Sequence, residues 1–483
     1  MDADVVVVGA GPTGLLLAGD LAEMGVAVTV LERRTGESNV TRAFAVHART
    51  MEELDIRGLA GELARTGTQI RQLRLFDRVR VDLSALPSEF GSLLVTPQYE
   101  TERVLAQRAD ALGVRIVRGA EVTGIAQDAH GVNVTARAAR YRASYVVGAD
   151  GVNSAVRRVL GLPFPGRSVI KSIMLADVRL SAPPSDVLTV NGVGDAFAFV
   201  APFGDGWYRI FAWNRRNQVD DKAPVDLDEI REVTRRALGT DFGMHDPRWL
   251  SRFHSDERQA PRYRVGRVFL AGDAAHCHSP AGGQGMNTGL QDAANLSWKL
   301  AAAVHGWGGE PLLDSYHDER YSVGRQVLRS SGAILRLALI RPRWAQRARN
   351  VIGQILMAIP PVATRVAGTI SGVGIRYPAP PGADPRVGSR VPDIPLTGGR
   401  LHEALRGGRF VLVGTDAASV DLPAQVDAAV PERAAGELLL VRPDGYLAWV
   451  GTAAEFAAWG RRYFSGGSVR RPDQAFSAKS AGK

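Results

Sequence analysis

The chain has 483 residues, of which 45% are hydrophobic and 23% charged, ordinary values for a soluble globular protein with two or three domains. The net charge of +9 is spread along the chain without a long basic block, zinc-ligand spacing or stacking motif, which excludes a typical nucleic-acid-binding protein. No apolar run reaches the about 18 residues of a membrane span, and the single cysteine, Cys277, excludes an internal disulfide framework and favours a cytoplasmic protein.

The chain begins with a glycine-rich turn between an apolar strand and an apolar helix. Four valines at positions 5–8 lead into the sequence Gly9-Ala10-Gly11-Pro12-Thr13-Gly14. This pattern predicts a buried parallel strand followed by a helix whose N-terminus binds a pyrophosphate. A second predicted strand, residues 26–31, leads to Glu32, 18 residues after Gly14, close to the spacing of about 20 residues expected for a carboxylate that accepts ribose hydroxyls. The start of the chain therefore predicts a dinucleotide site.

Arginines follow Glu32 and recur in the next segment. Arg33 and Arg34 are either solvated charges or ligands of the 2′-phosphate of NADP. We prefer FAD at this site, because Glu32 would repel that phosphate. Arg42 and Arg49 lie in a predicted loop and helix over residues 41–54, and each is either a surface charge or a contact to phosphate or flavin.

Strands and helices continue to alternate over residues 70–163. Strand-like patches over 70–96 predict an excursion into a second domain, and a helix is predicted over 98–112. Short strands are predicted at 115–118 and 132–136. A further strand, starting at Tyr145, ends in the turn Ala149-Asp150-Gly151 before another helix start.

The pattern changes between Phe164 and Arg258. Alternating residues predict strands over 173–180, 186–191, 196–201 and 207–214, followed by a charged helix over 227–238. Antiparallel strands with one helix predict a sheet domain inserted into the nucleotide-binding domain. Its apolar and aromatic positions either floor a substrate pocket or form ordinary sheet core: Phe197, Phe199, Phe203, Phe211 and Trp213.

A strand–turn–helix pattern then returns. A strand over 267–271 ends at Gly272-Asp273, and a glycine-rich loop over 280–287 precedes a helix predicted to begin near Met286 and end near Val304. The start of this helix favours negative charge on whatever lies against the loop. His276-Cys277-His278 has no further Cys or His group nearby in sequence, so we predict no metal site. Ser154 and Ser279 lack a G-x-S-x-G elbow, which disfavours serine hydrolysis.

The remainder of the chain is predicted to be helical over 311–372, with breaks at Pro342 and Pro360-Pro361. A Pro/Gly-rich linker over 377–395 marks a boundary. Strand-like segments at 410–414, 437–441 and 447–450 predict a small α/β domain, and the tail from Ser465 is predicted to be disordered.

Three blocks of sequence occur together: GAGPTG with Glu32, YVVGADGVNSAVR at 145–157, and RVFLAGDAAHCHSPAGGQGMNTGLQDAANLSWKL at 267–300. Together they resemble the single-component FAD-dependent aromatic hydroxylases of the para-hydroxybenzoate hydroxylase type. The segment LVRPDGYLAW at 440–449 is similar to the ending of the subgroup that oxidises aromatic polyketides and rifamycin-like compounds.

The resemblance implies an α/β fold with a Rossmann-like FAD-binding domain, an inserted mixed-sheet substrate domain and a C-terminal thioredoxin-like domain. With no cysteine beyond Cys277, that last domain would be structural. We expect the FAD-binding domain at 1–75, 97–163 and 259–378, the substrate domain at 76–96 and 164–258, the C-terminal domain at 379–465 and a flexible tail at 466–483.

The resemblance also carries cofactor roles to matching positions. Arg42 and Gln98 would contact the pyrophosphate or ribityl region, and Asp273 the ribityl chain. Asp150 is either a ligand of FAD and NADPH, as in the family, or an Asx-type turn and helix cap. Of the aromatic residues, Phe199, Phe211 and Trp213 are the candidates for the substrate pocket. The expected cofactor-binding residues are Gly9, Gly11, Thr13, Gly14, Glu32, Arg33, Arg42, Gln98, Asp150, Asp273, Pro280, Gly283, Gly285, Met286 and Asn287.

The implied reaction is oxygenation of an aromatic small molecule by O2. NADPH or NADH would reduce FAD, and a C4a-hydroperoxyflavin would transfer oxygen to a phenolic ring. Because one dinucleotide fingerprint is present, we expect NAD(P)H to bind transiently. No residue is named as a catalytic base; Arg209, Tyr208 and His254 are possible, but each is as easily a surface or core group.

Alternatives are Baeyer–Villiger cleavage or epoxidation of a polyketide, inactivation of an antibiotic, and a non-catalytic flavin- or drug-binding protein. We expect a monomer or homodimer with no nucleic-acid or membrane partner.

Overall fold

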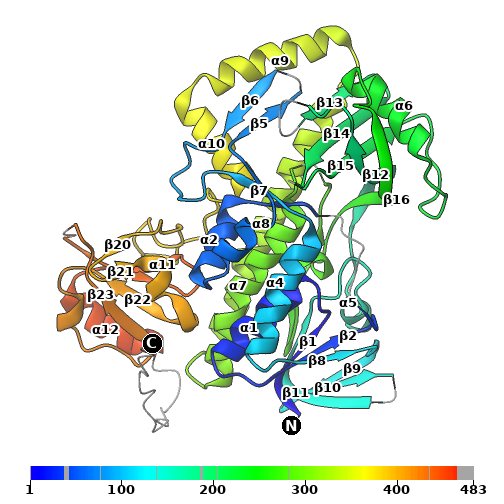
Figure 1. Ribbon diagram of the computed structural model, residues 1–483. Helices are drawn as coiled ribbons and strands as arrows, with labels where there is room; N and C mark the ends of the chain where they lie inside the picture. The colour runs from blue at the N-terminus through cyan, green and yellow to red at the C-terminus, as the bar shows by residue number, and fades with distance from the viewer. Residues whose placement is uncertain are drawn as a thin grey trace, which may run out of the picture.

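The computed structural model describes residues 2–36, 43–76, 78–137, 139–184, 189–203, 205–280, 282–433 and 436–464 (Figure 1). Arg42 and the tail from Ser465 lie outside these residues, as does the start of the strand predicted over 186–191.

A mostly parallel sheet holds the start of the chain. The valine run forms β1 at the centre, paired in parallel with β2 and β11. The valines are apolar without alternation because both faces of β1 are covered, and Val5, Val6 and Val7 are fully buried. The strand order is β17-β18-β11-β1-β2-β8, with β10 and β9 extending from β11. The bounds are β1 (Ala3–Val8), β2 (Val28–Glu32), β8 (Arg115–Arg118), β9 (Val122–Asp128), β10 (Gly131–Ala136), β11 (Ala139–Gly148), β17 (Arg264–Val265) and β18 (Val268–Leu270).

Helices from distant parts of the sequence cover this sheet. α1 contacts both α4 and α7, and α7 also contacts α8, so the middle of α7 is almost wholly buried. In Figure 1 these helices stand side by side above the sheet. The bounds are α1 (Pro12–Glu23), α2 (Ala48–Ile56), α3 (Ala60–Ala64), α4 (Gln98–Ala111), α5 (Ala155–Val159), η1 (Gly272–Ala274), α7 (Gln284–Val304) and α8 (Glu310–Ala338).

A second, mainly antiparallel sheet has the order β19-β16-β12-β15-β14-β13-β5-β6. One face packs on α6, and the other packs on a small sheet of β3, β7 and β4. β5 and β6, which come from the predicted excursion, join this sheet through β13. The bounds are β3 (Ala45–Val46), β4 (Thr68–Ile70), β5 (Gln72–Leu75), β6 (Val79–Asp82), β7 (Leu93–Val95), β12 (Gly166–Leu180), β13 (Thr189–Val193), β14 (Ala196–Pro202), β15 (Tyr208–Asn214), α6 (Leu227–Leu238), β16 (Met244–Gln259) and β19 (His276–Cys277).

The sequence did not predict β16. It runs beside β12 for most of its length, yet carries charged residues such as Arg252, Asp256 and Arg258, which masked a strand pattern. The mixed α/β fold class is confirmed, whereas the domain boundaries given above remain predictions.

After α8 the chain forms α9 (Arg343–Met357) and α10 (Pro360–Ser371), with breaks at the predicted prolines. Among the described residues no single helix is long and apolar enough for a membrane span; α9 and α10 pass that test only as a pair bent by 104°.

The C-terminal region is a small α/β unit with the sheet order β23-β22-β24-β25. It packs beside α2 and α7 in Figure 1, and Trp298 of α7 contributes to its apolar core. The bounds are β20 (Pro395–Leu396), β21 (Gly399–Arg400), α11 (Leu401–Ala404), η2 (Arg406–Gly408), β22 (Phe410–Val413), η3 (Ala417–Ser419), β23 (Val426–Ala429), β24 (Leu438–Val441), β25 (Leu447–Gly451) and α12 (Ala453–Phe464).

Candidate cofactor site

The N-terminal turn is built from backbone that a side chain would obstruct. A Cβ at Gly14 would lie 2.0 Å from the Gly9 carbonyl oxygen, and a Cβ at Gly9, whose φ is +106°, would lie 2.5 Å from the Ala149 oxygen. Gly11 differs, because a Cβ there would have no atom within 4 Å. Gly11 is the N-cap of α1 and provides no side-chain cap. The helix start is therefore open for an anion to approach.

Glu32, at the end of β2, reaches this turn. Its carboxylate accepts hydrogen bonds from the Ala10 backbone N–H at 2.8 Å and from the Arg34 backbone and Nε at 2.9 Å each. Burial raises the pKa of Glu32, but the hydrogen bonds from Arg34 and Ala10 outweigh it and hold the pKa below its usual value. An ionised carboxylate beside the glycine turn can accept ribose hydroxyls. Arg33 is exposed.

The second sequence block meets the first at Asp150. One carboxylate oxygen accepts hydrogen bonds from the Ala155 and Val156 backbone at 2.6 and 3.2 Å, so Asp150 caps α5. The other oxygen, Oδ1, is buried and has no partner among the described residues. Burial raises the pKa of Asp150 above its usual value, despite hydrogen bonds from Ser154 and the backbone. Capping uses one oxygen, and the second remains able to accept a hydrogen bond from a ligand.

The third block meets the first at Thr13. A Cβ at Gly272 would lie 2.7 Å from Thr13 Oγ1, and a Cβ at Gly289 would lie 2.4 Å from it. The first turn of α1 therefore touches both the Gly272-Asp273 turn and α7. Asp273 is exposed on this turn.

A buried network that the sequence did not predict fixes the Gly272 turn. Asp292 on α7 accepts hydrogen bonds from the Gly272 N–H at 3.0 Å and from Arg320 Nε at 2.6 Å. The ring of His276 lies 2.6 Å from the same carboxylate and 2.9 Å from His278. Burial raises the pKa of Asp292, but His276 and Arg320 offset this and bring it to about 2. Both residues stand in recognisable sequence segments, His276 in GDAAH and Asp292 in QDA. Their pairing could not be predicted, because only the fold brings the two segments together.

The glycine-rich loop ends earlier than predicted, because α7 begins at Gln284. Gly283, with φ +63°, is the N-cap and offers no side-chain cap, and a Cβ at Gly285 would meet no atom within 4 Å. Met286 is half-buried and lies in the first turn with Asn287. Pro280 is half-buried where the loop begins. The start of α7 thus presents backbone N–H groups to open space, which favours a negatively charged group.

His47 and Asn287 hold this loop in place. The Asn287 amide donates to the Ala45 and Gly283 carbonyls at 2.9 and 2.8 Å and accepts from the His47 N–H at 2.8 Å. His47 Nε2 lies 2.8 Å from the Gly282 carbonyl oxygen. Because that oxygen only accepts, Nε2 carries the proton. Burial lowers the pKa of His47 to about 4 although its contacts with Gly282 and Gly283 raise it, so the ring is neutral and Nδ1 is left buried without a described partner.

Gln98 fixes the chain beside the same loop. Its Oε1 accepts from the Ala43 N–H, its backbone N–H donates to the Ala43 carbonyl, both at 3.2 Å, and its amide nitrogen donates to Glu102. The predicted contact of Gln98 with the cofactor stays a prediction.

The aromatic candidates lie in one buried cluster next to residue 44. Phe44 is 4.9 Å from Phe199 and 5.6 Å from Phe211, measured between ring centroids. Trp213 belongs to the same apolar cluster and donates to the Lys171 carbonyl at 3.0 Å. The cluster joins the second sheet to β3 and β7. These residues are therefore sheet core, and they are also the apolar side chains next to β3, which contacts the 282–287 loop.

The other candidates fall into structural contacts. Arg209 is buried and makes two 2.8 Å hydrogen bonds to Asp177. His254 is half-exposed and pairs with Asp221, and Tyr208 is half-buried. Cys277 is buried, and burial raises its pKa to about 12.

Of the two interpretations of Arg49, a contact with phosphate or flavin stays a prediction. The interpretation as a surface charge is wrong, because Arg49 is fully buried and binds Glu52, Glu53 and the Asp444 carbonyl. Arg49 therefore joins α2 to the C-terminal region.

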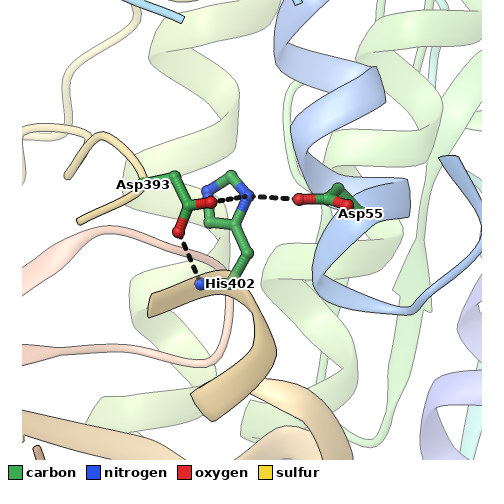
Figure 2. A group of neighbouring side chains, drawn as sticks. All are labelled: Asp55, Asp393 and His402. Carbon is green, nitrogen blue, oxygen red and sulfur yellow. Dashed lines mark hydrogen bonds and ion pairs between the residues drawn. The ribbon is translucent and has the colours of Figure 1, made fainter. Parts of the chain in front are cut away.

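A group with metal-ligand residue types lies at that same contact (Figure 2). The His402 ring is 2.8 Å from Asp55, and the backbone N–H of His402 donates to Asp393 at 2.8 Å. Arg400 already supplies the cation, pairing with Asp55 and, at 2.7 Å, with Asp393. Burial raises the pKa of Asp55, but Arg400 and His402 hold it well below its usual value. The group is a charged contact between α2 and α11, not a vacant metal centre.

The residues around the three blocks fit FAD. Two places have open space and an uncapped helix start: Gly11 at α1 and Gly285 at α7. Asp150, with its partnerless oxygen, adjoins the N-terminal turn at Gly9, and His47, with its partnerless nitrogen, adjoins the 282–287 loop. A flat, anionic dinucleotide has the chemistry to satisfy these groups.

Family models and related proteins match most of the chain. Residues 2–331 match a family described as FAD binding domain, and 384–464 match aromatic-ring hydroxylase, C-terminal. The chain is 40% identical over 458 residues to a rifampicin monooxygenase from Streptomyces venezuelae, covering 93% of this chain and 95% of that protein. It is 39% identical over 485 residues to a 12-dehydrotetracycline 5-monooxygenase/anhydrotetracycline 6-monooxygenase from Streptomyces rimosus, with 93% and 95% covered. The structure of OxyS anhydrotetracycline hydroxylase from Streptomyces rimosus matches with a TM-score of 0.83 and 36% identity, over 97% of this chain and 100% of that one.

Proposed function

The chain belongs to the FAD-dependent aromatic-ring hydroxylases, and from this membership we propose that it adds one oxygen atom to a polycyclic phenolic substrate of the polyketide or rifampicin type. It is a flavin-dependent monooxygenase; the substrate class is the proposal. Bound FAD supplies the redox chemistry, accepting hydride from NAD(P)H and activating O2 for transfer to the ring.

The protein's part is to bind and orient. Glu32 would accept the ribose hydroxyls, the start of α1 would hold the pyrophosphate, and the start of α7 would stabilise negative charge on the flavin. Asp150 would accept a hydrogen bond through Oδ1, which its capping role leaves unused. His47 and Asn287 keep the 282–287 loop in the shape this requires.

The protein also excludes water from the reacting ring. Phe44, Phe199 and Phe211 form an apolar wall that continues directly from β3, where Ala45 accepts the Asn287 hydrogen bond. A phenolic ring that stacks against this wall lies in a dry environment, which protects a reactive oxygen donor from hydrolysis. NAD(P)H binds only for the reduction step, without a nucleotide domain of its own.

One observation carries this proposal. Three blocks separated by more than a hundred residues meet at the N-terminal turn, the second against Gly9 and the third against Thr13. Each brings unused hydrogen-bonding capacity: the uncapped starts of α1 and α7, and Asp150 Oδ1.

The test is turnover. Purified FAD-loaded protein is incubated with NADPH, O2 and a panel of anthraquinone, angucycline, tetracycline and rifamycin compounds. We expect at least one compound to accelerate NADPH oxidation tenfold or more and to gain one oxygen, read by mass spectrometry. The position of that oxygen separates hydroxylation from Baeyer–Villiger cleavage or epoxidation.

If compounds bind but none stimulates NADPH oxidation, the chain is a binding protein and the proposal is refuted. Whether the product has lost antibacterial activity separates inactivation from biosynthesis.

A further inference from the structure

Helix α9 turns its apolar side away from the protein. No residue of α9 is buried. Trp344 is 74% exposed, Ile355 59% and Ile352 56%. We call the exposed apolar side chains of this helix and its end the α9 patch; its residues are Trp344, Val351, Ile352, Ile355, Leu356 and Ile359.

The inner face of α9 is occupied by other residues. Gly353 lies against Val79 of β6, where a Cβ would come within 2.6 Å. Arg349 lies 4.3 Å over the Phe76 ring, and Gln354 donates to the Arg78 carbonyl. Because these contacts fix the inner face, the apolar stripe at helical spacing must point outward. A soluble helix normally has the opposite arrangement, and a contiguous exposed apolar patch indicates a binding surface.

The segment of chain that carries the patch has charges of one sign. From Arg320 to Ala383 the sequence has ten arginines and no aspartate or glutamate. Arg343 and Arg347 are exposed on α9 and make no ion pair with another described residue, whereas Arg341 lies 3.9 Å from Asp195. In Figure 1 the helix forms the outer rim at the top of the molecule, remote from the C-terminal region.

We propose that the α9 patch binds the surface of an anionic lipid membrane, with α9 lying in the interface plane. Tryptophan and isoleucine side chains enter the boundary between head groups and acyl chains, and the arginines pair with lipid phosphates. A second copy of the chain fits less well, because two such faces would bring like charges together. This departs from the expectation of no membrane partner, and it is independent of the substrate class proposed above.

The experiment is vesicle flotation of the full FAD-loaded chain. Vesicles of phosphatidylglycerol with phosphatidylcholine are compared with phosphatidylcholine alone. We expect at least tenfold more protein to float with the anionic vesicles. Adding 0.5 M salt should reduce this fraction, because it shortens the Debye length to about 3–5 Å and so screens the attraction between the arginines and the lipid phosphates.

Variants separate the two contributions. Ile352→Glu/Ile355→Glu removes the apolar insertion and Arg343→Gln/Arg347→Gln removes charge; each is expected to lower the bound fraction at least tenfold. Val430→Glu is the matched control, an exposed apolar residue of the C-terminal region, and should bind as the parent does. Unchanged thermal midpoints and flavin spectra establish that the variants fold.

A fluorescence measurement needs no charged variant. The difference between the emission of the parent and of Trp344→Phe isolates Trp344, and we expect it to shift to shorter wavelength when anionic vesicles are added.

Absence of the parent chain from anionic vesicles, or binding that survives both double variants, would overturn the proposal. So would a dimer that Ile352→Glu/Ile355→Glu dissociates without any vesicle binding, which would identify the patch as an interface between copies.

Discussion

The edge of the nucleotide-binding sheet and the contact with the C-terminal region are both buried and polar, but they satisfy their polar groups differently. At the sheet edge, glycine backbone and uncapped helix starts leave Asp150 Oδ1 and His47 Nδ1 without described partners. At the C-terminal contact, Glu319 receives hydrogen bonds from Arg442, Lys299 and Asn295. Neutral atoms such as Asn295 Oδ1 and Tyr446 OH lack described partners at this contact too, so the contrast lies in the carboxylates. A buried carboxylate oxygen without a partner, as at Asp150, marks a surface for a ligand, whereas a carboxylate paired with arginine and lysine, as at Glu319, marks a structural joint.

The two regions should respond differently to substitution. Changes at the C-terminal contact should alter the free energy of unfolding and leave the FAD affinity of the folded protein unchanged. Changes to the groups with unused hydrogen-bonding capacity at the sheet edge should alter the FAD affinity, and stability should fall there only where a buried contact or a helix cap is lost.

The largest expected effect is on stability at the C-terminal contact. Burial raises the pKa of Glu319, but Arg442 and Lys299 outweigh it and hold the pKa well below its usual value. Glu319→Gln leaves the buried charge of Lys299 without its ion-pair partner and Arg442 with Asp444 alone, and we expect a loss of about 3–5 kcal/mol in the free energy of unfolding. Urea unfolding measures it. Glu437→Gln, at a 52% exposed carboxylate paired with Arg386, is the control and should cost less than about 1 kcal/mol. A large loss of FAD affinity in folded Glu319→Gln would contradict the claim that the C-terminal contact is purely structural.

A smaller effect is expected from acid at the sheet edge. His47 has a folded pKa of about 4, below the about 6.5 of an unfolded chain. Between these values the unfolded chain binds the extra proton, so stability falls as the pH falls, by up to about 3 kcal/mol in total. His47→Gln should flatten the dependence of unfolding free energy on pH between 6.5 and 4.5, while His130→Gln, in an exposed turn, should not. Equal slopes in all three proteins would contradict the buried neutral state of His47.

The smallest effect separates two residues that cap the same helix. Ser154 accepts from the Arg157 N–H at 2.9 Å, so Ser154→Ala should cost about 1 kcal/mol of stability with no change in FAD affinity. Asp150→Asn keeps an oxygen for the cap but removes the carboxylate charge and Oδ1. We expect little change in thermal midpoint and a severalfold change in the affinity for FAD or NADPH, measured by titration. Identical behaviour of the two variants would reduce Asp150 to a cap.

Strong local patterns gave several elements closely. The helix predicted over 227–238 coincides with α6, and the predicted end of α7 near Val304 is correct. The strand β16 was missed because its charged residues pair with partners that only the fold brings near, such as Arg252 with Glu229.

The candidate site could be predicted where a local sequence motif determines the position of its residues. Gly9, Gly14 and Glu32 lie where the strand–turn–helix pattern requires. The anchoring by His47 and Asn287 joins residues 240 positions apart, and no local pattern encodes such a contact. Helix α9 shows a further limit: its periodicity predicts an apolar stripe, but Gly353 against Val79 determines that the stripe faces outward.

The most direct test of the central claim is the FAD affinity of the Gly11→Ala apoprotein. A methyl group at Gly11 meets no atom within 4 Å, as is also true at Gly61 in α3, so both alanine variants should fold with thermal midpoints close to the parent's. If a pyrophosphate lies against Gly11, Gly11→Ala should weaken FAD binding at least tenfold, about 1.4 kcal/mol, while Gly61→Ala binds one FAD per chain as the parent does. Equal FAD affinity in the two variants would show that the cofactor does not lie at the junction of the three blocks.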